Sequence, residues 1–390
     1  MNLPKKLEDK LEKRRENNSL RSLTGQQGFV DFSSNDYLGL SRSSLIFEAS
    51  HLYLKDKNIS QNGATGSRLI SGNHLLYQEA EHFLCDFHKS ESALIFNSGY
   101  DANVGFFSAV PQRGDVILYD EYAHASIRDG IQMSNAKAYK FKHNNVKHLE
   151  ELLSRYSTNV TSSAVERSMT IYIVTESIFS MDGDSPDLEK MIDVSNQYKA
   201  LLIVDEAHAV GVCGKNGVGL IQELELQDKV FARIVTFGKG LGCHGATILG
   251  SNELKEYLVN FARSIIYTTG LPPHSLATIM KSYNFLSSSD GVKNVLKLNE
   301  NILFFKEEIK RLELQKLFLP SNSSIHSCII SGNEKVKNCA KQIQKKGFEV
   351  KPILSPTVPE GEERIRFCLH SYNSQQEITN VLETLRTFAS

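Results

Sequence analysis

The stretch Leu201-Leu202-Ile203-Val204-Asp205-Glu206-Ala207-His208 places a carboxylate directly after four apolar residues and an imidazole three residues later. Further along, Thr236-Phe237-Gly238-Lys239-Gly240-Leu241-Gly242 sets a lysine among glycines, where a flat ring could approach the backbone closely. A lysine that forms a Schiff base, with an aspartate as partner for a pyridinium nitrogen, is what a pyridoxal phosphate (PLP) enzyme needs. The two stretches together therefore predict a PLP site.

Around these stretches, short runs rich in Ile, Val and Leu alternate with helical patterns such as 74–88 and 188–198. The predicted buried strands are 92–96, 115–119, 169–175, 201–205 and 234–236. Strands that alternate with helices favour an α/β fold with a mostly parallel central sheet.

After Pro272-Pro273 the pattern changes to long helices, 275–286 and 292–312, followed by short strands at 327–330, 348–353 and 364–369 and a last helix at 375–388. We therefore expect three parts: an N-terminal segment over 1–45, a large PLP-binding domain over 46–272 and a small C-terminal α+β domain over 273–390. The N-terminal segment holds a predicted helix, 3–18, and a short strand, 29–32; Ser162–Ser168 is expected to be a polar loop.

The composition excludes several classes of protein. The chain has 390 residues, a net charge of -1 and 41% hydrophobic residues, so it has no overall bias toward nucleic acid or anionic membranes. Its six cysteines are scattered without a Cys-x-x-Cys motif, which argues against a disulfide scaffold or a zinc site. The charged N-terminus has no apolar signal core, and no stretch is apolar enough to span a bilayer. We expect a cytoplasmic protein without a bound metal.

Three polar side chains are candidates for the chemistry. Asp205 at the end of a strand would face a crevice, where it pairs either with a pyridinium or, alternatively, with a cation or a helix N-terminus. His208 would lie near the phenolic oxygen of the ring, or be a core histidine bonded to backbone. His124 would stack on the ring, or be a surface histidine on a helix.

Glycines mark the expected phosphate site. Gly99 follows a strand and opens a helix, so backbone N–H groups of the first turn could face an anion. Thr236, three residues before Lys239, would add a hydroxyl to the phosphate site.

The small and polar segment Gly63–Gly72 is either a flexible loop or a segment that lies against a ligand or another subunit. In Arg364-Ile365-Arg366, one arginine should face inward toward a carboxylate; the alternative is a pair of solvated charges on an edge strand.

Asp205-Glu206-Ala207-His208 also spells the DEAH box of a nucleic-acid-dependent ATPase. Such a motor needs a Gly-x-x-x-x-Gly-Lys-Ser/Thr phosphate loop upstream, and the sequence has none. The chain also lacks the basic balance that a motor on nucleic acid requires.

Several motifs stand in order along nearly the whole chain and resemble those of the α-oxoamine synthases, PLP enzymes of the aspartate-aminotransferase-like fold. They are Asn35-Asp36-Tyr37-Leu38-Gly39-Leu40, Gly63-Ala64-Thr65-Gly66-Ser67-Arg68, Ser71-Gly72-Asn73-His74, Phe179-Ser180-Met181-Asp182-Gly183-Asp184, Asp205-Glu206-Ala207-His208, Thr236-Phe237-Gly238-Lys239 and Pro356-Thr357-Val358-Pro359. The runs Phe32-Ser33-Ser34-Asn35 and Ser355–Pro359 point to the member that acts in biotin synthesis.

The resemblance implies roles for the matching positions. Lys239 would bind the cofactor, Asp205 would pair with the pyridinium, and His124 would stack on it. The residues around the cofactor would be Gly99, Tyr100, Ser180, His208 and Thr236. The resemblance also implies a homodimer with shared sites, in which Thr268 and Thr269 reach the phosphate of the partner chain. Asn35 and Arg366 would hold the carboxylate of the amino acid, and Arg21 and Thr357 would touch the acyl substrate, with His124 beside both.

The implied reaction is the decarboxylative condensation of an amino acid with an acyl thioester, here L-alanine with a pimeloyl thioester. A sister activity would use glycine with a short acyl-CoA or serine with a long-chain thioester. A PLP-binding protein without activity would lack Lys239 or Asp205. Two features depart from the family: Ile353-Leu354-Ser355 lacks the arginine often found before Pro-Thr-Val-Pro, and glycines stand at 240 and 270, which should loosen the backbone slightly.

Overall fold

The computed structural model describes residues 3–21, 23, 28–157 and 169–389, so the polar loop expected at 162–168 lies outside the described residues. The chain divides into two compact units. The larger unit consists of Asp36–Ser180 and Asp184–Leu296, and the smaller unit of Met1–Asn35, Met181–Gly183 and Lys297–Ser390. No helix in the described part of the chain is both long and apolar enough to cross a membrane.

Seven strands form the central sheet of the larger unit, in the order β2-β8-β7-β6-β5-β3-β4. They are β2 (Ser92–Phe96), β3 (Val116–Asp120), β4 (Lys137–Phe141), β5 (Ile171–Glu176), β6 (Leu201–Asp205), β7 (Ala232–Thr236) and β8 (Ala246–Gly250). β8 runs antiparallel to both of its neighbours, and the other pairs are parallel. The expectation of a mostly parallel central sheet is confirmed.

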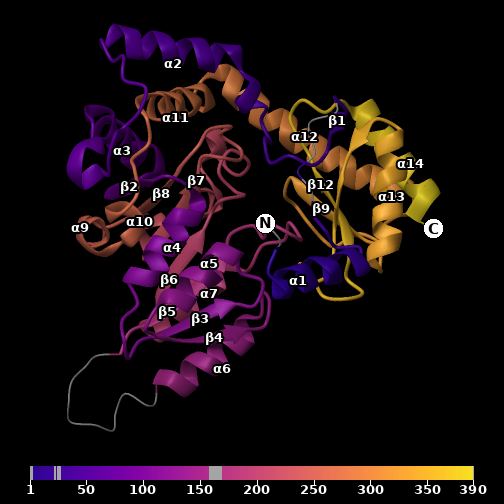
Figure 1. The fold of residues 1–390 in the computed structure, drawn as a ribbon, viewed down its shortest axis with the longest axis horizontal. Helices are drawn as coiled ribbons and strands as arrows, with labels where there is room; N and C mark the ends of the chain where they lie inside the picture. The colour runs from indigo at the N-terminus through magenta and orange to yellow at the C-terminus, as the bar shows by residue number, and fades with distance from the viewer. Residues whose placement is uncertain (1–2, 22, 24–27, 158–168, 390) are drawn as a thin grey trace. The chain divides into compact units, whose positions relative to one another are not determined.

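Helices cover the sheet of the larger unit, and Figure 1 shows α4 and α5 beside its strands. The helices are α2 (Ser44–Asp56), α3 (Leu75–His88), α4 (Gly99–Ala109), α5 (Ala125–Met133), α6 (Val146–Ser157), α7 (Leu188–Gln197), α8 (Leu220–Glu223), α9 (Asn252–Phe261), α10 (Arg263–Ile266) and α11 (Pro273–Leu286), with a π-helical turn at Arg68–Gly72.

Two apolar clusters pack on the strands of this sheet. Alternate residues of a strand point to opposite faces. In β6, Ile203 belongs to the cluster that holds Phe106 of α4, whereas Leu202 and Val204 belong to the cluster that holds Met191 of α7. Asp205 has the parity of Ile203 and is therefore directed to the side of α4.

The smaller unit contains a three-stranded antiparallel sheet in the order β11-β12-β9, formed by Lys351–Ile353, Arg364–Cys368 and Ile325–Ile329. A second, parallel pair joins β1 (Val30–Asp31) to β10 (Phe348–Glu349). Its helices are α1 (Lys5–Glu16), α13 (Asn333–Lys345) and α14 (Gln375–Ala389), and α12 (Ser289–Arg311) contains the boundary between the units. The predicted strand 348–353 is two strands, because its halves pair with different partners.

The two units differ from the expected ranges 1–45, 46–272 and 273–390. Residues up to Asn35 belong with the C-terminal residues, because β1 pairs with β10. Helix α11 belongs to the larger unit, because it packs against α2 and α3. Pro272 and Pro273 begin α11, where the missing N–H of a proline costs nothing, and do not mark a domain boundary.

Candidate active site

A pocket of about 180 Å³ in the larger unit lies at the ends of β5, β6 and β7. Most of the residues predicted to surround the ring and the phosphate line it. Its lining residues are Gly99, Tyr100, Asn103, His124, Ser126, Glu176, Asp205, Ala207, Ile234, Thr236 and Lys239. In α/β sheets, ligands bind at the carboxyl ends of the strands, and this pocket has that position.

The carboxylate of Asp205 is buried and held from two sides. Asn103 Nδ2 donates to its Oδ2 at 2.9 Å, and the backbone N–H of Ala207 donates to its Oδ1 at 2.9 Å. Asn103 comes from α4, which packs on the face of the sheet to which Asp205 points. The side chain is therefore oriented by protein donors and still borders the pocket.

Lys239 follows β7, and its Nζ lies 2.8 Å from Nε2 of His208. The other ring nitrogen of His208, Nδ1, lies 2.6 Å from the hydroxyl of Tyr37. His208 is thus bonded to two side chains, and the alternative of a core histidine bonded to backbone does not describe these contacts.

His124 is the N-cap of α5, and it is exposed, as the alternative of a surface histidine predicted, but it also lines the pocket. Its Nδ1 lies 2.8 Å from Ser126 Oγ and accepts from the backbone N–H of Ser126 at 3.2 Å. The side chain opens on the pocket. Desolvation by the surrounding atoms lowers the pKa of His124, and the positive charge of Lys239 lowers it further. A neutral imidazole at this place suits a flat stacking surface.

Glu176 is a second carboxyl group in the pocket, at the end of β5 and paired in register with Asp205. Its Oε1 accepts from the backbone N–H of His124 at 2.7 Å, which fixes the turn before α5. Burial, together with the charge of Asp205, raises the pKa of Glu176 to about 8. Glu176 therefore retains its proton at neutral pH.

The start of α4 borders the pocket beside Thr236. Ser98 caps the helix by accepting from the N–H of Asp101 at 3.1 Å. A Cβ added at Gly99 would meet Thr236 Oγ1 at 3.4 Å, so this glycine leaves space between the helix terminus and the hydroxyl. Tyr100 is 52% exposed, and its hydroxyl donates to Asp129 at 3.0 Å.

The other predicted site residues do not line this pocket. Ser180 lies half-buried in a turn beyond β5. Thr268 Oγ1 and the carbonyl of Thr269 both accept from Asn97 Nδ2, at 3.1 and 2.6 Å, next to the end of β2. Their predicted contact with the partner's phosphate stays a prediction.

The four predicted substrate contacts belong to the smaller unit and form two pairs there. Arg366 Nη2 donates to Asn35 Oδ1 at 2.9 Å, and Arg21 Nη2 donates to Thr357 Oγ1 at 3.4 Å. Residues far apart in the sequence thus form each pair, and their roles in substrate binding stay predictions. Arg364 is buried and paired with Asp182, so it is the inward arginine. β12 is the middle strand of its sheet, and the edge-strand alternative is wrong.

The glycines at 240 and 270 are required by packing. A Cβ at Gly240 would lie 2.5 Å from the carbonyl oxygen of Val210, and one at Gly270 would lie 3.0 Å from the hydroxyl of Tyr77. The expectation that they loosen the backbone slightly stays a prediction. In Gly63–Gly72, a Cβ at Gly66 would collide with the hydroxyl of Ser71, and one at Gly72 with the carbonyl oxygen of Gly66. Those glycines let the segment fold back on itself.

Four residues of the site were not predicted: Tyr37, Asn103, Ser126 and Glu176. Glu176 could have been found by the rule that selected Asp205, since it also ends an apolar strand. Tyr37 belongs to the motif Asn35–Leu40, but the resemblance implied no role for it. Asn103 and Ser126 carry no signal in the sequence, because their position depends on how α4 and α5 pack.

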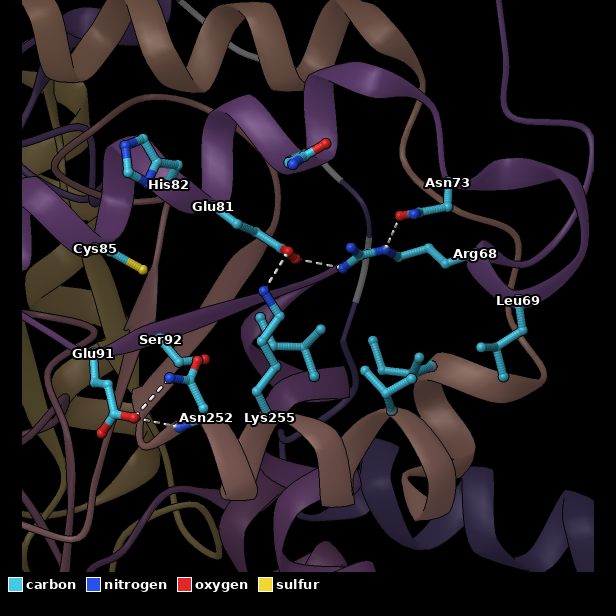
Figure 2. A pocket seen from close by; sticks show the side chains of 14 residues that line it. Arg68, Leu69, Asn73, Glu81, His82, Cys85, Glu91, Ser92, Asn252 and Lys255 are labelled. Atoms are coloured by element: carbon cyan, nitrogen blue, oxygen red, sulfur yellow. Dashed lines mark hydrogen bonds and ion pairs between the residues drawn. The ribbon is translucent and has the colours of Figure 1, made fainter.

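A larger pocket of about 510 Å³ in the same unit contains none of the predicted catalytic residues. Figure 2 shows Arg68 and Lys255 both pointing toward Glu81, with ion pairs of 2.6 and 2.9 Å. Glu91 accepts from Asn252 at 2.7 Å in the same view. Because these charges satisfy one another, the pocket offers no evident chemistry.

Comparison with known proteins agrees with this geometry. The family model for aminotransferase class I and II matches residues 27–385. The chain is 38% identical to the 8-amino-7-oxononanoate synthase of Emericella nidulans, over 92% of this chain and 89% of that protein.

Two solved structures are also similar. The 8-amino-7-oxononanoate synthase of Francisella tularensis has a TM-score of 0.76 at 29% identity, over 93% of this chain and 98% of that one. A serine palmitoyltransferase with PLP has a TM-score of 0.88 at 24% identity, over 99% and 98%, which shows a common fold.

The chain belongs to the aminotransferase class I and II family and, within it, to the α-oxoamine synthases. The predicted aspartate-aminotransferase-like fold and the predicted cofactor, PLP, are confirmed. Asp205–His208 is therefore not the box of an ATPase.

The residues present fit this cofactor. The pocket combines an amine, a buried carboxylate, a neutral imidazole and, between Gly99 and Thr236, a space at a helix N-terminus. The amine suits the aldehyde of PLP, and the carboxylate suits the pyridine nitrogen. The imidazole suits the face of the ring, and the helix N-terminus suits the phosphate.

Proposed function

We propose that this chain condenses L-alanine with a pimeloyl thioester, of coenzyme A or of a carrier protein, to give 8-amino-7-oxononanoate, carbon dioxide and free thiol in biotin biosynthesis. The observation that carries the proposal is that Lys239, Asp205 and His124 line one pocket. The chain that holds this pocket is 36–38% identical to proteins named for this product. The cellular site that we propose is the cytoplasm.

PLP, when bound, supplies an aldehyde that bonds to amines and a protonated ring that withdraws electrons from the α-carbon. Lys239 Nζ is the amine that holds the cofactor, and when released it accepts and returns the α-proton. The carboxylate of Asp205 keeps a proton on the ring nitrogen. His124 covers the ring and excludes water from one face, while Thr236 and the N–H groups at the start of α4 hold the phosphate.

In the overall reaction, one carbon–carbon bond forms between the α-carbon of alanine and the thioester carbon, and the thiolate leaves. The carboxyl group of alanine leaves as carbon dioxide, and a proton replaces it. We assign the binding of that carboxyl group to Arg366, which Asn35 orients. Arg21 and Thr357, which are bonded to each other, are assigned to the acyl chain.

A sister activity with another acyl group, that of a glycine C-acetyltransferase, a 5-aminolevulinate synthase or a serine palmitoyltransferase, is the second candidate. Leu354 favours it, because it stands where a cation could have bound the distal carboxylate of a pimeloyl chain. A panel of pimeloyl, acetyl, succinyl and palmitoyl thioesters against alanine, glycine and serine separates the two candidates. Released thiol should be highest for alanine with the pimeloyl compound.

The assignment of Lys239 is tested by Lys239→Ala. We expect the purified variant to lose both the visible absorbance of covalently bound PLP and turnover. Lys255→Ala, a lysine of the other pocket, is the control and should keep both. A Lys239→Ala protein that retained covalently bound PLP would place the attachment at another lysine.

We further propose a homodimer in which Thr268 and Thr269 complete the site of the partner chain. Hybrids of Lys239→Ala chains with chains that carry Thr268→Ala and Thr269→Ala should regain activity, because one of the two sites is then intact. Absence of rescue after proven subunit exchange would mean that each chain builds its own site.

A further inference from the structure

Tyr37, His208 and Lys239 form a continuous hydrogen-bonded series in the larger unit. Tyr37 is fully buried, and its hydroxyl oxygen lies 2.6 Å from His208 Nδ1. Nε2 on the other side of the same ring lies 2.8 Å from Lys239 Nζ. The imidazole of His208 thus links Tyr37 to the amine assigned to the cofactor.

The shorter of these two distances favours the Tyr37 hydroxyl as a donor. Hydrogen bonds with a hydroxyl donor span about 2.5–3.0 Å, whereas those with an N–H donor span about 2.7–3.2 Å. The 2.6 Å distance fits a hydroxyl donor, and we infer from it that Tyr37 donates to His208 Nδ1. A neutral imidazole carries one hydrogen, so that hydrogen must lie on Nε2.

The hydrogen on Nε2 points at Lys239 Nζ. An ammonium group has no lone pair and cannot accept it, whereas a neutral amine can. Hydrogen bonding to the neutral form of a group disfavours its charged form. The arrangement of Tyr37 and His208 thus acts on the protonation state of Lys239.

We propose that Tyr37 is a positioning residue that holds His208 as the Nε2–H tautomer and thereby keeps the released Lys239 as a neutral amine. A neutral amine is needed both to attack the aldehyde of PLP and to accept the α-proton. The proposal rests on the proposed role of Lys239 and adds the device that sets its reactivity.

Other titratable groups also face Lys239. Asp205, Glu176 and His124 line the same pocket, and both Glu176 and His124 interact electrostatically with the amine. They are unchanged when only the hydroxyl of Tyr37 is removed. The difference between the wild-type protein and Tyr37→Phe therefore isolates the contribution of that hydroxyl.

The chain contains a matched control for this change. Tyr283 is also fully buried, and its hydroxyl lies 2.8 Å from Nε2 of His88, a histidine that does not line the pocket. Tyr283→Phe removes a buried Tyr–His hydrogen bond of the same kind without touching His208 or Lys239.

The experiment measures the rate constant for binding of PLP to cofactor-free protein as a function of pH, followed by visible absorbance. In Tyr37→Phe the midpoint should move up by about one pH unit or more, with roughly tenfold slower binding below both midpoints. Tyr283→Phe should retain the wild-type midpoint. An unshifted midpoint in a folded Tyr37→Phe protein would overturn the proposal.

A second measurement reads the tautomer of His208 in the wild-type protein. In wild-type protein with ¹⁵N-labelled histidine, free of cofactor, the His208 signals are identified by their loss in His208→Gln. They should show hydrogen on Nε2 and none on Nδ1; the opposite tautomer contradicts the proposal. Covalently bound PLP that persisted in Lys239→Ala would instead disprove the proposed role of Lys239, so the two failures are distinguishable.

Discussion

Asn103 Nδ2 donates a 2.9 Å hydrogen bond to Oδ2 of Asp205. The same nitrogen lies 3.0 Å from Ser126 Oγ, which lies 2.8 Å from Nδ1 of His124. A single buried amide on α4 thus connects the carboxylate assigned to the pyridine nitrogen with the imidazole assigned to the ring face. One side chain therefore helps to orient both groups.

Asn103→Ala should weaken the binding of PLP. The variant removes a buried hydrogen bond to a charged group, which is worth about 1.5–3 kcal/mol, or roughly 10- to 100-fold in the dissociation constant. Titration of cofactor-free protein with PLP measures the effect. Ser108→Ala on the same helix, whose hydroxyl bonds to the backbone of Val104, is the control. Equal affinity in the two variants would remove Asn103 from the site.

The ends of the strands could be predicted, because an apolar run followed by a charged residue marks where a buried strand meets a crevice. This rule located Asp205. Lys239, which is set among glycines shortly after the strand β7, is the second residue of the PLP site that it predicts. The same rule would also have identified Glu176, which stands at the end of the apolar strand β5.

The contacts of Asp205 could not be predicted, because they depend on packing. Asn103 is a polar residue within a helix, and it reaches Asp205 only because α4 covers the face to which Ile203 points. In the same way, nothing local in the run 348–353 shows that its first half pairs with β1 and its second half with β12.

Asp205→Asn should slow removal of the α-proton by about 10² to 10⁴, or roughly 3–5 kcal/mol in the barrier. Both oxygens of Asp205 accept hydrogen bonds, from Asn103 and from the N–H of Ala207. Either orientation of the new amide sets its NH₂ group against one of these donors, so some stability is lost as well. Exchange of the α-proton of alanine into heavy water measures the chemical effect. Near-normal exchange in folded protein would contradict the role of Asp205.

Glu176→Gln should change how the stability of cofactor-free protein depends on pH. The folded-state pKa of Glu176 is raised to about 8 by burial and by the charge of Asp205, above the ordinary value of 4.5. Its contribution to stability is therefore fully present below pH 4.5 and is lost as the pH rises through 8. The neutral glutamine removes this dependence.

The free energy of unfolding, measured in urea between pH 5 and about 8.5, tests this sign. Relative to Glu176→Gln, the wild-type protein should lose stability steadily as the pH rises. Parallel curves for the two proteins would mean that Glu176 is ionised in the folded state at neutral pH.

Gly240→Ala should destabilise the loop that carries Lys239. The new Cβ would lie 2.5 Å from the carbonyl oxygen of Val210, which is rigid backbone. Overpacking of this kind costs about 1–3 kcal/mol in the free energy of unfolding. Gly63→Ala, where an added Cβ meets nothing within 4 Å, is the control and should be nearly neutral. A stable Gly240→Ala protein with full PLP affinity would show that the loop can shift without harm.

Arg21→Ala should raise the KM for the pimeloyl thioester and leave the KM for alanine nearly unchanged. Arg21 and Thr357 lie at opposite ends of the sequence, yet they are joined by a 3.4 Å hydrogen bond. Arg21 is therefore the cation beside the acyl-assigned Thr357, in a chain that has Leu354 where an arginine is often found. Loss of one charge-assisted contact should increase this KM roughly 10- to 100-fold.

Arg15→Ala is the control for this prediction. It removes another exposed arginine, one that is paired with Glu12, and should change neither KM. If acetyl or palmitoyl thioesters were preferred and Arg21→Ala had no effect on them, the acyl group would be uncharged and the chain would have a sister activity with the same PLP chemistry.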